Sequence, residues 1–482
     1  MGLLGILIAL GLLIWLAYRG WSVLLLAPAA AVLAAALAGQ PLLAHWTQTF
    51  MESAARFVAQ FFPIFLLGAL FGKLMEDSGS VASIAQYMTQ RLGPQRAVLA
   101  VVLAGAIVTY GGVSLFVAFF VLAPMAHQLF RSAAIPRRLM PAAIALGTTT
   151  FTMSALPGTP AIQNAIPMPF FGTTPFAAPG LGIIAAIAMF GFGMWWLARA
   201  ERSARAKGEG YGEEVAQKDA AEDLIVRERA TTASAFDPPE AIHGAPSEKG
   251  PPIALAALPL VVVVAVNLLM SLIILPGMDA SFLAKPEWGS TSLGAVGGVW
   301  AVVTALFVAI LVLIAINYRR LPALRDSMDA GANASVLPVL SVASLVGFGS
   351  VVAALPAFAA VRDWVLEIEG GPLVSLAVAT NVLASLTGSA SGGLTIALDA
   401  LGATYLKIAH EQGIDPGLLH RVAVIGAGTL DSLPHNGAVV TLLAVCNSTH
   451  RESYLDIVMV SIVGGLLALA LVIALGSTIG SF

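Results

Sequence analysis

Two stretches of the sequence place polar residues and prolines in the middle of an apolar run of helical length. The later stretch spans 426–447, and its central residues are Asp431, Ser432, Pro434, His435 and Asn436. The earlier stretch spans 147–167, and its central residues are Ser154, Pro157, Gly158 and Thr159. An ionisable residue inside a membrane-spanning segment is a functional candidate by default. Asp431 and His435 are therefore the strongest single candidates in the chain.

These two side chains suggest proton or cation chemistry. Asp431 could take up a coupling proton or bind a cation together with backbone carbonyls. His435 could contact a carboxylate when protonated, or relay a proton, because its unperturbed pKa is ~6.5. The structural alternative is a mutual hydrogen bond between them that closes the break, and Pro434 between them prevents any assumption of same-face helical geometry.

Two further interruptions occur in apolar runs, at 109–114 and 387–393, and each is rich in glycine, serine and threonine. Backbone that leaves a helix at membrane depth needs partners from protein or from a water-filled cavity. We therefore expect the four breaks to form one central site. Helices starting after Pro157 and Pro434 would point their N-termini at it, which favours an anion. For any single serine or glycine, simple helix packing is the alternative.

Composition places the chain in a membrane. Of 482 residues, 58% are hydrophobic and 11% are charged, against roughly 25% charged in soluble domains. The mean hydropathy is +0.88. The net charge of -3 gives no reason to expect nucleic acid as a partner. The sequence has no GxSxG, HExxH or GxxxxGK[ST] motif, so we expect no enzyme, no metal and no cofactor.

The order of apolar runs repeats once, which predicts an all-α polytopic membrane protein. The first half is 1–198, with a hairpin at about 97–128 and a broken helix at 139–166; a polar linker is 199–252; the second half is 253–482, with a hairpin at about 372–406 and a broken helix at 417–447. Each half holds five spans and one hairpin. Because five is odd, the halves enter the membrane from opposite faces and form an inverted repeat.

Basic residues predict the orientation. Most of the 24 lysines and arginines lie in segments that face the cytoplasm if the 199–252 linker is cytoplasmic. Both termini are then periplasmic. The remaining basic residues fall outside or at the outer boundary, and they are Arg56, Lys285, Arg362, Lys407 and Arg421.

Several motifs resemble the gluconate permease (GntP) family of the ion-transporter superfamily. They are FFPIFLLGALFGKLMEDSGS at 61–80, VTYGGVSLFVAFFVLAPMA at 108–126, SALPGTPAIQNAIP at 154–167, TGSASGGLTIAL at 387–398 and LDSLPHNGAVVTLLAVCN at 430–447. The resemblance implies a secondary active importer of small hydroxylated monocarboxylates in the bacterial inner membrane. It also implies a homodimer in which hairpins and broken helices move as an elevator.

The resemblance carries the substrate-binding role to matching tip and break positions. These are Gly111, Gly112, Ser114, Ser154, Pro157, Gly158, Thr159, Gly388, Ser389, Ser391, His435 and Asn436. Asp431 and His435 are the ion-coupling candidates, with H⁺ or Na⁺ as the coupling ion.

The sequence of the first break differs from that of the sugar-acid members of the family. It reads Leu-Pro-Gly-Thr-Pro at 156–160 and lacks the histidine of their Pro-Pro-His-Pro-Gly-Pro type break. The motifs look closer to the D-3-hydroxybutyrate permease branch. The prediction is proton symport of a short hydroxy-monocarboxylate, most of all 3-hydroxybutyrate. The alternatives are a gluconate or other sugar-acid permease, a sodium-coupled carboxylate symporter, and an ion or proton antiporter.

Overall fold

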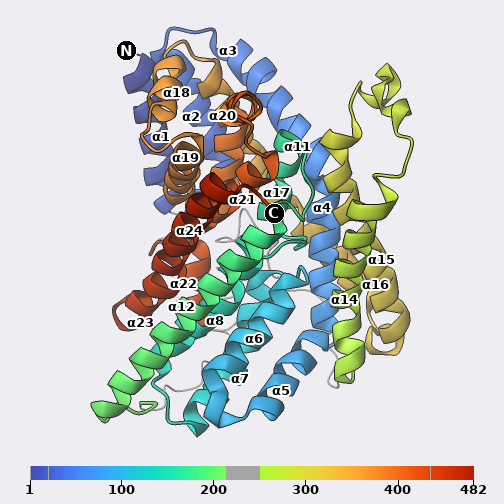
Figure 1. The fold of residues 1–482 in the computed structure, drawn as a ribbon, viewed down its shortest axis with the longest axis vertical. Helices are drawn as coiled ribbons and strands as arrows, with labels where there is room; N and C mark the ends of the chain where they lie inside the picture. The colour runs from blue at the N-terminus through green and yellow to red at the C-terminus, as the bar shows by residue number, and fades with distance from the viewer. Residues whose placement is uncertain (1, 20, 213–249, 435) are drawn as a thin grey trace.

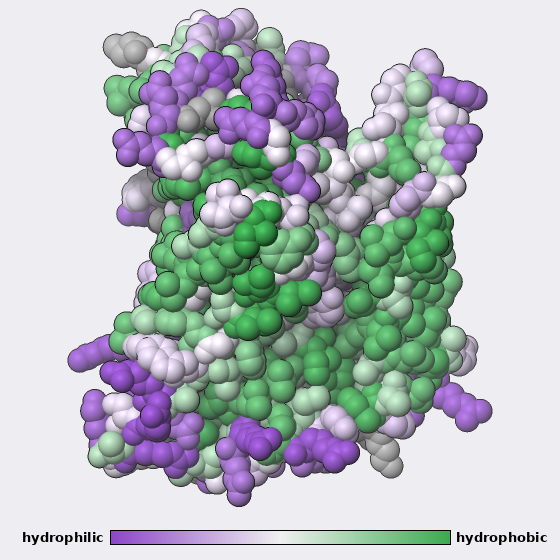
Figure 2. All heavy atoms as spheres, in the orientation of Figure 1, coloured by the Kyte–Doolittle hydropathy of each residue, from purple (hydrophilic) through white to green (hydrophobic). Residues whose placement is uncertain are grey.

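The chain folds into helices that cross a membrane. The structure, a computed structural model, describes residues 2–19, 21–212, 250–434 and 436–482, and these contain no strand. Seven of its helices are long and apolar enough to cross a bilayer, or up to eight if a sharply bent pair is one span. Figure 2 shows a broad apolar band between two polar ends. The expected all-α polytopic architecture is confirmed.

The first half begins with two apolar helices and a long third one, followed by a short helix, a hairpin, a broken segment and a final long helix. Its α-helices are α1 (Gly2–Tyr18), α2 (Val23–Leu37), α3 (Leu42–Ala44), α4 (Met51–Asp77), α5 (Ser80–Leu92), α6 (Ala97–Tyr110), α7 (Leu115–Ser132), α8 (Met140–Thr148), α9 (Phe151–Ser154), α10 (Ile162–Ala165), α11 (Pro167–Phe171) and α12 (Pro179–Ala206). A π-helical turn, His45–Phe50, joins α3 to α4, so that 42–77 is one continuous span.

The second half repeats this order. Its α-helices are α14 (Ile253–Leu269), α15 (Leu293–Asn317), α16 (Leu324–Ala334), α17 (Val336–Ala354), α18 (Phe358–Leu366), α19 (Pro372–Thr387), α20 (Ala390–Gln412), α21 (Pro416–Thr429), α22 (Gly437–Val445), α23 (His450–Ile457) and α24 (Gly464–Ile479). π-helical turns at Met270–Ile274 and Val458–Val463 extend α14 and join α23 to α24. The 3₁₀ turns of the chain are Pro94–Arg96, Arg137–Leu139, Ser281–Ala284, Pro286–Trp288, Tyr318–Arg320 and Leu430–Ser432.

Both hairpins turn where the sequence places their tips. Gly112, at φ +96°, follows α6, and Gly388, at φ +65°, ends α19. This backbone region is open to glycine and strained for most other residues. The helix after each tip begins with a serine cap, because Ser114 accepts from Phe116 N and Ser389 accepts from Gly392 N. The tips are thus fixed locally by glycine and serine.

The two hairpins approach the centre from opposite ends of the molecule. In Figure 1, α5, α6 and α7 lie at the lower end, while α18, α19 and α20 lie at the upper end. The long helices α4, α14 and α15 stand together at one side, and α12 packs against α24 along the other. The broken segments lie between the hairpins, so the fold brings all four interruptions towards its middle.

Three features differ from the sequence-based expectations. The helices α5 and α16 were not expected as separate elements, because each has a polar face that lowers its hydropathy below that of a span. The last helix of the first half, α12, runs to Ala206 and so extends beyond residue 198. After Pro157 the helical backbone resumes only at Ile162, as four-residue α10 and five-residue α11, which are joined by Ile166 in the right-handed helical region.

Candidate functional site

A buried arginine, Arg421, donates hydrogen bonds to backbone carbonyls at the first break. Arg421 on α21 has no exposed surface. Its Nη1 donates to the carbonyl of Ser154 at 3.2 Å, and its Nη2 donates to the carbonyl of Ala177 at 2.7 Å. The same Nη1 lies 3.4 Å from Asn164 Oδ1. Carbonyls freed by the break therefore hold the Arg421 guanidinium inside the protein, and its place at the outer boundary of the membrane stays a prediction.

The Asn164 amide and the His420 imidazole make further hydrogen bonds at the first break. Asn164 is fully buried, and its Nδ2 donates to the carbonyls of Thr159 and Pro175, both at 3.0 Å. His420 Nε2 lies 3.1 Å from Asn164 Oδ1, and His420 Nδ1 lies 2.7 Å from the Thr173 hydroxyl. The break between α9 and α11 is thus tied to α21 by a continuous hydrogen-bond network.

Two more helices supply donors to the first break. Asn267 on α14 donates from Nδ2 to the carbonyl of Gly158 at 3.0 Å, and Tyr110 at the end of α6 donates to the carbonyl of Pro157 at 2.8 Å. Gly158 has φ +81°, and a Cβ there would lie 2.4 Å from the Phe176 ring. These donors and the tight packing at Gly158 stabilise this conformation of the break, and its carbonyls are largely used by the protein itself.

Asn436 organises the second break. Its Oδ1 accepts from Ala438 N at 2.7 Å, which caps α22. Its Nδ2 donates to the Asp431 carboxylate at 2.7 Å and to the carbonyl of Gly388 at 2.8 Å. The tip of the second hairpin is thereby joined to the break. His435, and with it the alternative of an Asp431–His435 bond, lies outside the described residues.

Helix α23 supports the second break from below α22. His450 Nε2 donates to the carbonyl of Pro434 at 2.7 Å, and the Tyr454 hydroxyl donates to the carbonyl of Ser432 at 3.2 Å. As in the first break, side chains from a neighbouring helix satisfy carbonyls that no longer belong to a helix.

Two small cavities lie between the breaks. The larger, of about 70 Å³, lies against α4 and is lined by polar groups from the first tip and the first break, among them Gly112, Ser114 and Gln163. The smaller, of about 10 Å³, is lined by Asp431 and Asn436 of the second break. Leu115 and Met153 line both, so the cavities are neighbours.

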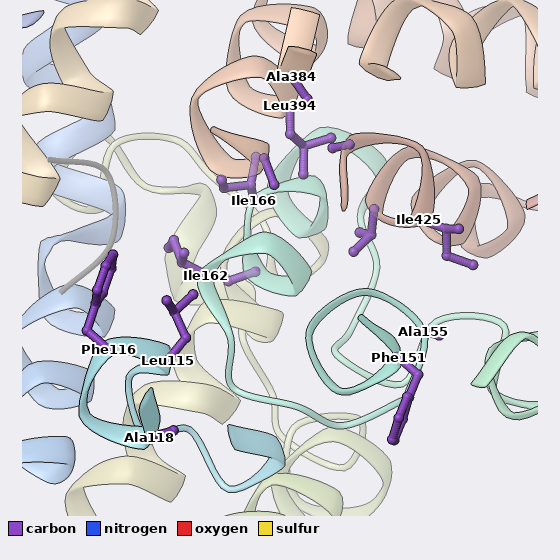
Figure 3. Close-up of a cluster of buried hydrophobic side chains, with 14 of the residues drawn as sticks. Leu115, Phe116, Ala118, Phe151, Ala155, Ile162, Ile166, Ala384, Leu394 and Ile425 are labelled. Carbon is purple, nitrogen blue, oxygen red and sulfur yellow. The ribbon is translucent and has the colours of Figure 1, made fainter. Parts of the chain in front are cut away.

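Apolar side chains surround this region. Figure 3 shows a cluster of buried apolar side chains that includes Leu115 and Phe116 at the start of α7, Ile162 and Ile166 at the first break, and Ile425 on α21. Leu115 and Ile162 of this cluster also line the larger cavity. A polar group in such surroundings interacts strongly with a ligand because water is largely excluded. The two cavities with their polar lining are the candidate site.

The structure divides the sequence-based candidates into lining and supporting residues. Lining the two cavities are Gly112, Ser114, Asp431 and Asn436. Neither cavity is lined by Gly111, Ser154, Pro157, Gly158, Thr159, Gly388, Ser389 or Ser391. A Cβ on Gly111 would overlap Leu260, and the Ser389 and Ser391 hydroxyls lie 3.1 Å apart. In this conformation the supporting residues shape the turns, and only the first tip borders the larger cavity.

The supporting roles of Asn267, His420, Arg421, His450 and Tyr454 were not expected from the sequence. The run GLLHRVAVIGAG at 417–428 carries a signal for two of them, because a histidine and an arginine interrupt an otherwise apolar helix. Arg421 forms no ion pair with a carboxylate of the described residues, and carbonyl and amide oxygens hold it instead. A net positive charge thus lies beside the first break.

Comparison with known proteins identifies the family. The family model for GntP family permeases matches residues 1–205. The uncharacterized transporter YxjC of Bacillus subtilis (strain 168) is 42% identical over 472 residues, covering 96% of each protein. The chain belongs to the GntP permease family. A shorter similarity, 37% identity over 106 residues, links it to the high-affinity gluconate transporter of Escherichia coli (strain K12), covering 21% of this chain and 23% of that protein.

Solved transporters share the fold. MtrF of Neisseria gonorrhoeae superposes with a TM-score of 0.54 at 13% identity, covering 90% of this chain and 85% of that one. YdaH of Alcanivorax borkumensis gives a TM-score of 0.53 at 16% identity, covering 90% and 89%. This GntP permease is therefore a multi-pass membrane transporter, and the expectation that it is not an enzyme is confirmed by its family.

Proposed function

We propose that this permease imports a short hydroxy-monocarboxylate by proton symport, and that its substrate is 3-hydroxybutyrate. The observation that carries the proposal is the larger cavity, which combines a small volume of about 70 Å³ with hydroxyl, amide and backbone groups. A compact acid with one hydroxyl suits such a space better than a six-carbon polyhydroxy acid.

The carboxylate would bind at the first hairpin tip. Helix α7 has 18 residues and begins at Leu115, which lines the cavity, so its N-terminal dipole favours an anion there. Arg421 beside the first break adds positive charge without a carboxylate partner among the described residues. The Gln163 amide and the Ser114 hydroxyl on the cavity wall would hydrogen-bond the substrate oxygens.

Asp431 would couple transport to protons. When ionised it repels an incoming carboxylate, and protonation removes this repulsion, so that proton and anion bind together. Asn436 donates to the same carboxylate and fixes its position at the cavity wall. His435 is the second coupling candidate and would relay the proton.

Two alternatives share the site. The relative named a high-affinity gluconate transporter supports a sugar acid as substrate, although the small cavity favours a shorter one. Asp431 with carbonyl oxygens could instead bind Na⁺, since hard cations prefer oxygen ligands. The ion-antiporter alternative lacks a second acidic residue in either cavity lining.

The transport cycle would follow from the repeated element order. Each half supplies one hairpin and one broken helix, and the two hairpins enter from opposite ends (Figure 1). We propose that the two halves form an inverted repeat and that the hairpins and broken helices move as an elevator. The proposal further includes a homodimer in the bacterial plasma membrane with both termini periplasmic and the 199–252 segment cytoplasmic.

The deciding experiment is uptake of radiolabelled 3-hydroxybutyrate into proteoliposomes under an imposed proton gradient or sodium gradient. We expect accumulation above equilibrium with the proton gradient alone, and weak competition by gluconate. Stronger competition by gluconate than by unlabelled 3-hydroxybutyrate would overturn the substrate. Accumulation that requires sodium would overturn proton coupling, and no accumulation under either gradient would overturn active symport.

A further inference from the structure

An apolar crevice lies between α1, α17 and the second hairpin. Its volume is about 260 Å³, and its walls come from α1, α17, α18, α19 and α20. The lining side chains are aliphatic or aromatic, and they include Leu10, Phe348, Val382 and Leu401. None of them belongs to the candidate site, so the crevice is a second, chemically different space.

The crevice opens on the outer surface of the helix bundle. Leu7 and Trp364 line it and are 57% and 67% exposed, and Val382 at its wall is 45% exposed. Helices α1, α18 and α19 lie together at the upper left of Figure 1. In a chain that spans a bilayer, such a surface borders lipid. An empty apolar space would forfeit dispersion contacts that an acyl chain restores.

The rim carries charges of both signs. Arg362 and Asp363 on α18 form an exposed ion pair at 2.9 Å. Glu367 and Glu369, in the turn after α18, are exposed as well. Trp364 lies on the same helix, and tryptophan is enriched at the level of the lipid headgroups. One guanidinium and three carboxylates thus flank Trp364, Val365 and Ile368 in the chain, and these three residues line the crevice.

We propose that this crevice binds an acyl chain of a bilayer phospholipid, and that its rim selects phosphatidylethanolamine. The phosphate pairs with Arg362, and the ammonium group pairs with the surrounding carboxylates. An anionic headgroup such as that of phosphatidylglycerol offers no ammonium and is repelled by the two carboxylates that remain beside the Arg362–Asp363 ion pair.

The bound chain would act on the second hairpin. The Ser350 hydroxyl on α17 donates to the Asp399 carboxylate on α20, and the neighbouring positions Gly349 and Ala400 line the crevice. The tip of the same hairpin binds Asn436 through the carbonyl of Gly388. An acyl chain in the crevice would fill the space between this hairpin and α17. The position of the second break would then depend on which lipids surround the protein.

Photo-crosslinking tests the proposal in proteoliposomes that contain the full chain. The probe is phosphatidylethanolamine with a diazirine in its acyl chain, and labelled peptides are mapped by mass spectrometry. Val382→Trp fills the crevice mouth, and Ala379→Leu fills it from the wall. Val261→Trp, at a site 60% exposed on α14, is the matched control.

We expect labelling of peptides from α17–α20 to fall about tenfold in either crevice variant, a change of ~1.4 kcal/mol in binding, and to persist in Val261→Trp. Unlabelled phosphatidylethanolamine should compete more strongly than phosphatidylglycerol. Uniform labelling of all outward-facing helices, unchanged by the crevice variants, would show ordinary surrounding lipid and overturn the site. Equal competition by both lipids would overturn the headgroup selection.

Discussion

Two charged residues give the candidate site its character. Arg421 is held by oxygens of the first break, and Asp431 is held by Asn436 at the second break. The first supplies a permanent positive charge, since an arginine keeps its proton. The second has a charge that protonation can remove. A site with one fixed and one switchable charge suits the joint binding of an anion and a proton.

Asp431→Asn separates coupling from binding. The amide keeps the size and a hydrogen-bond acceptor for Asn436 but cannot exchange a proton. We expect proton-driven accumulation to fall at least about tenfold, the equivalent of ~1.4 kcal/mol, while counterflow exchange of labelled for unlabelled substrate persists. Asp329→Asn on α16, whose side chain is 69% exposed, is the control. Unchanged uphill uptake in Asp431→Asn would assign coupling to another group.

Arg421 can be tested as both a structural and an electrostatic group. Arg421→Gln leaves at least one carbonyl of the first break without a donor, which costs about 1–3 kcal/mol. Thermal unfolding in detergent should show this loss, and the KM for substrate should rise. Arg421→Lys should lose similar stability because it cannot reproduce the fork of donors.

The charge-retaining Arg421→Lys should nevertheless keep a KM near that of the unmodified protein. Equal KM increases in the two variants would leave Arg421 with a structural role alone. Arg325→Gln, at a side chain 92% exposed, controls for the general loss of an arginine.

At the scale of elements, the two breaks are built differently. The second is followed by nine-residue α22 with an asparagine cap, whereas the first is followed by two short helices and relies on donors from α6, α14 and α21. Sequence patterns located both breaks and both tips, because proline and glycine interrupt apolar runs visibly. The partners could not be predicted, since Asn267 and Arg421 reach the first break only through tertiary packing.

The cap of α22 gives a prediction about this element. Asn436→Ala removes the acceptor for Ala438 N together with both Nδ2 bonds, whereas Asn436→Ser keeps a capping oxygen and loses only the donors. We expect the alanine variant to be about 1 kcal/mol less stable than the serine variant. Hydrogen exchange of the α22 amides should accelerate in the alanine variant first.

A cap at the next helix supplies the control. Thr449→Ala removes the capping box of α23, where Thr449 and Glu452 bond reciprocally. Its faster exchange should be confined to α23. If both variants accelerated exchange in both helices, the local role of Asn436 would be wrong.

At the scale of the whole molecule, a second arginine, besides Arg421, joins the two halves. Arg138 before α8 donates to Glu209 after α12 at 2.7 Å and to Asp456 on α23 at 2.9 Å. Trp196 on α12 donates to the same Asp456 at 2.9 Å. Residues near the end of the first half are thereby fixed to the last helix pair of the second. Sequence could not show this, because the three groups are far apart in the chain.

The pH dependence of stability should report this junction. The hydrogen bond from Arg138 lowers the pKa of Glu209 from its ordinary value, and Glu209 raises the pKa of Arg138, which stays charged throughout. A depressed carboxyl pKa contributes stability above the unfolded-state value of about 4.3, and this contribution is lost as pH falls through the folded-state pKa. Because Glu209 is 38% exposed, the effect is small.

Glu209→Gln should therefore lower the midpoint of thermal unfolding by roughly 1–2 °C near neutral pH. The difference should hold down to about pH 5 and shrink below it as Glu209 is protonated in the unmodified protein. Glu287→Gln, at an exposed side chain of the 286–288 turn, should show no such difference. If the difference in unfolding midpoint between Glu209→Gln and the unmodified protein grew towards acid pH, ionised Glu209 would be less stabilising than protonated Glu209. The junction would then depend on Asp456 alone.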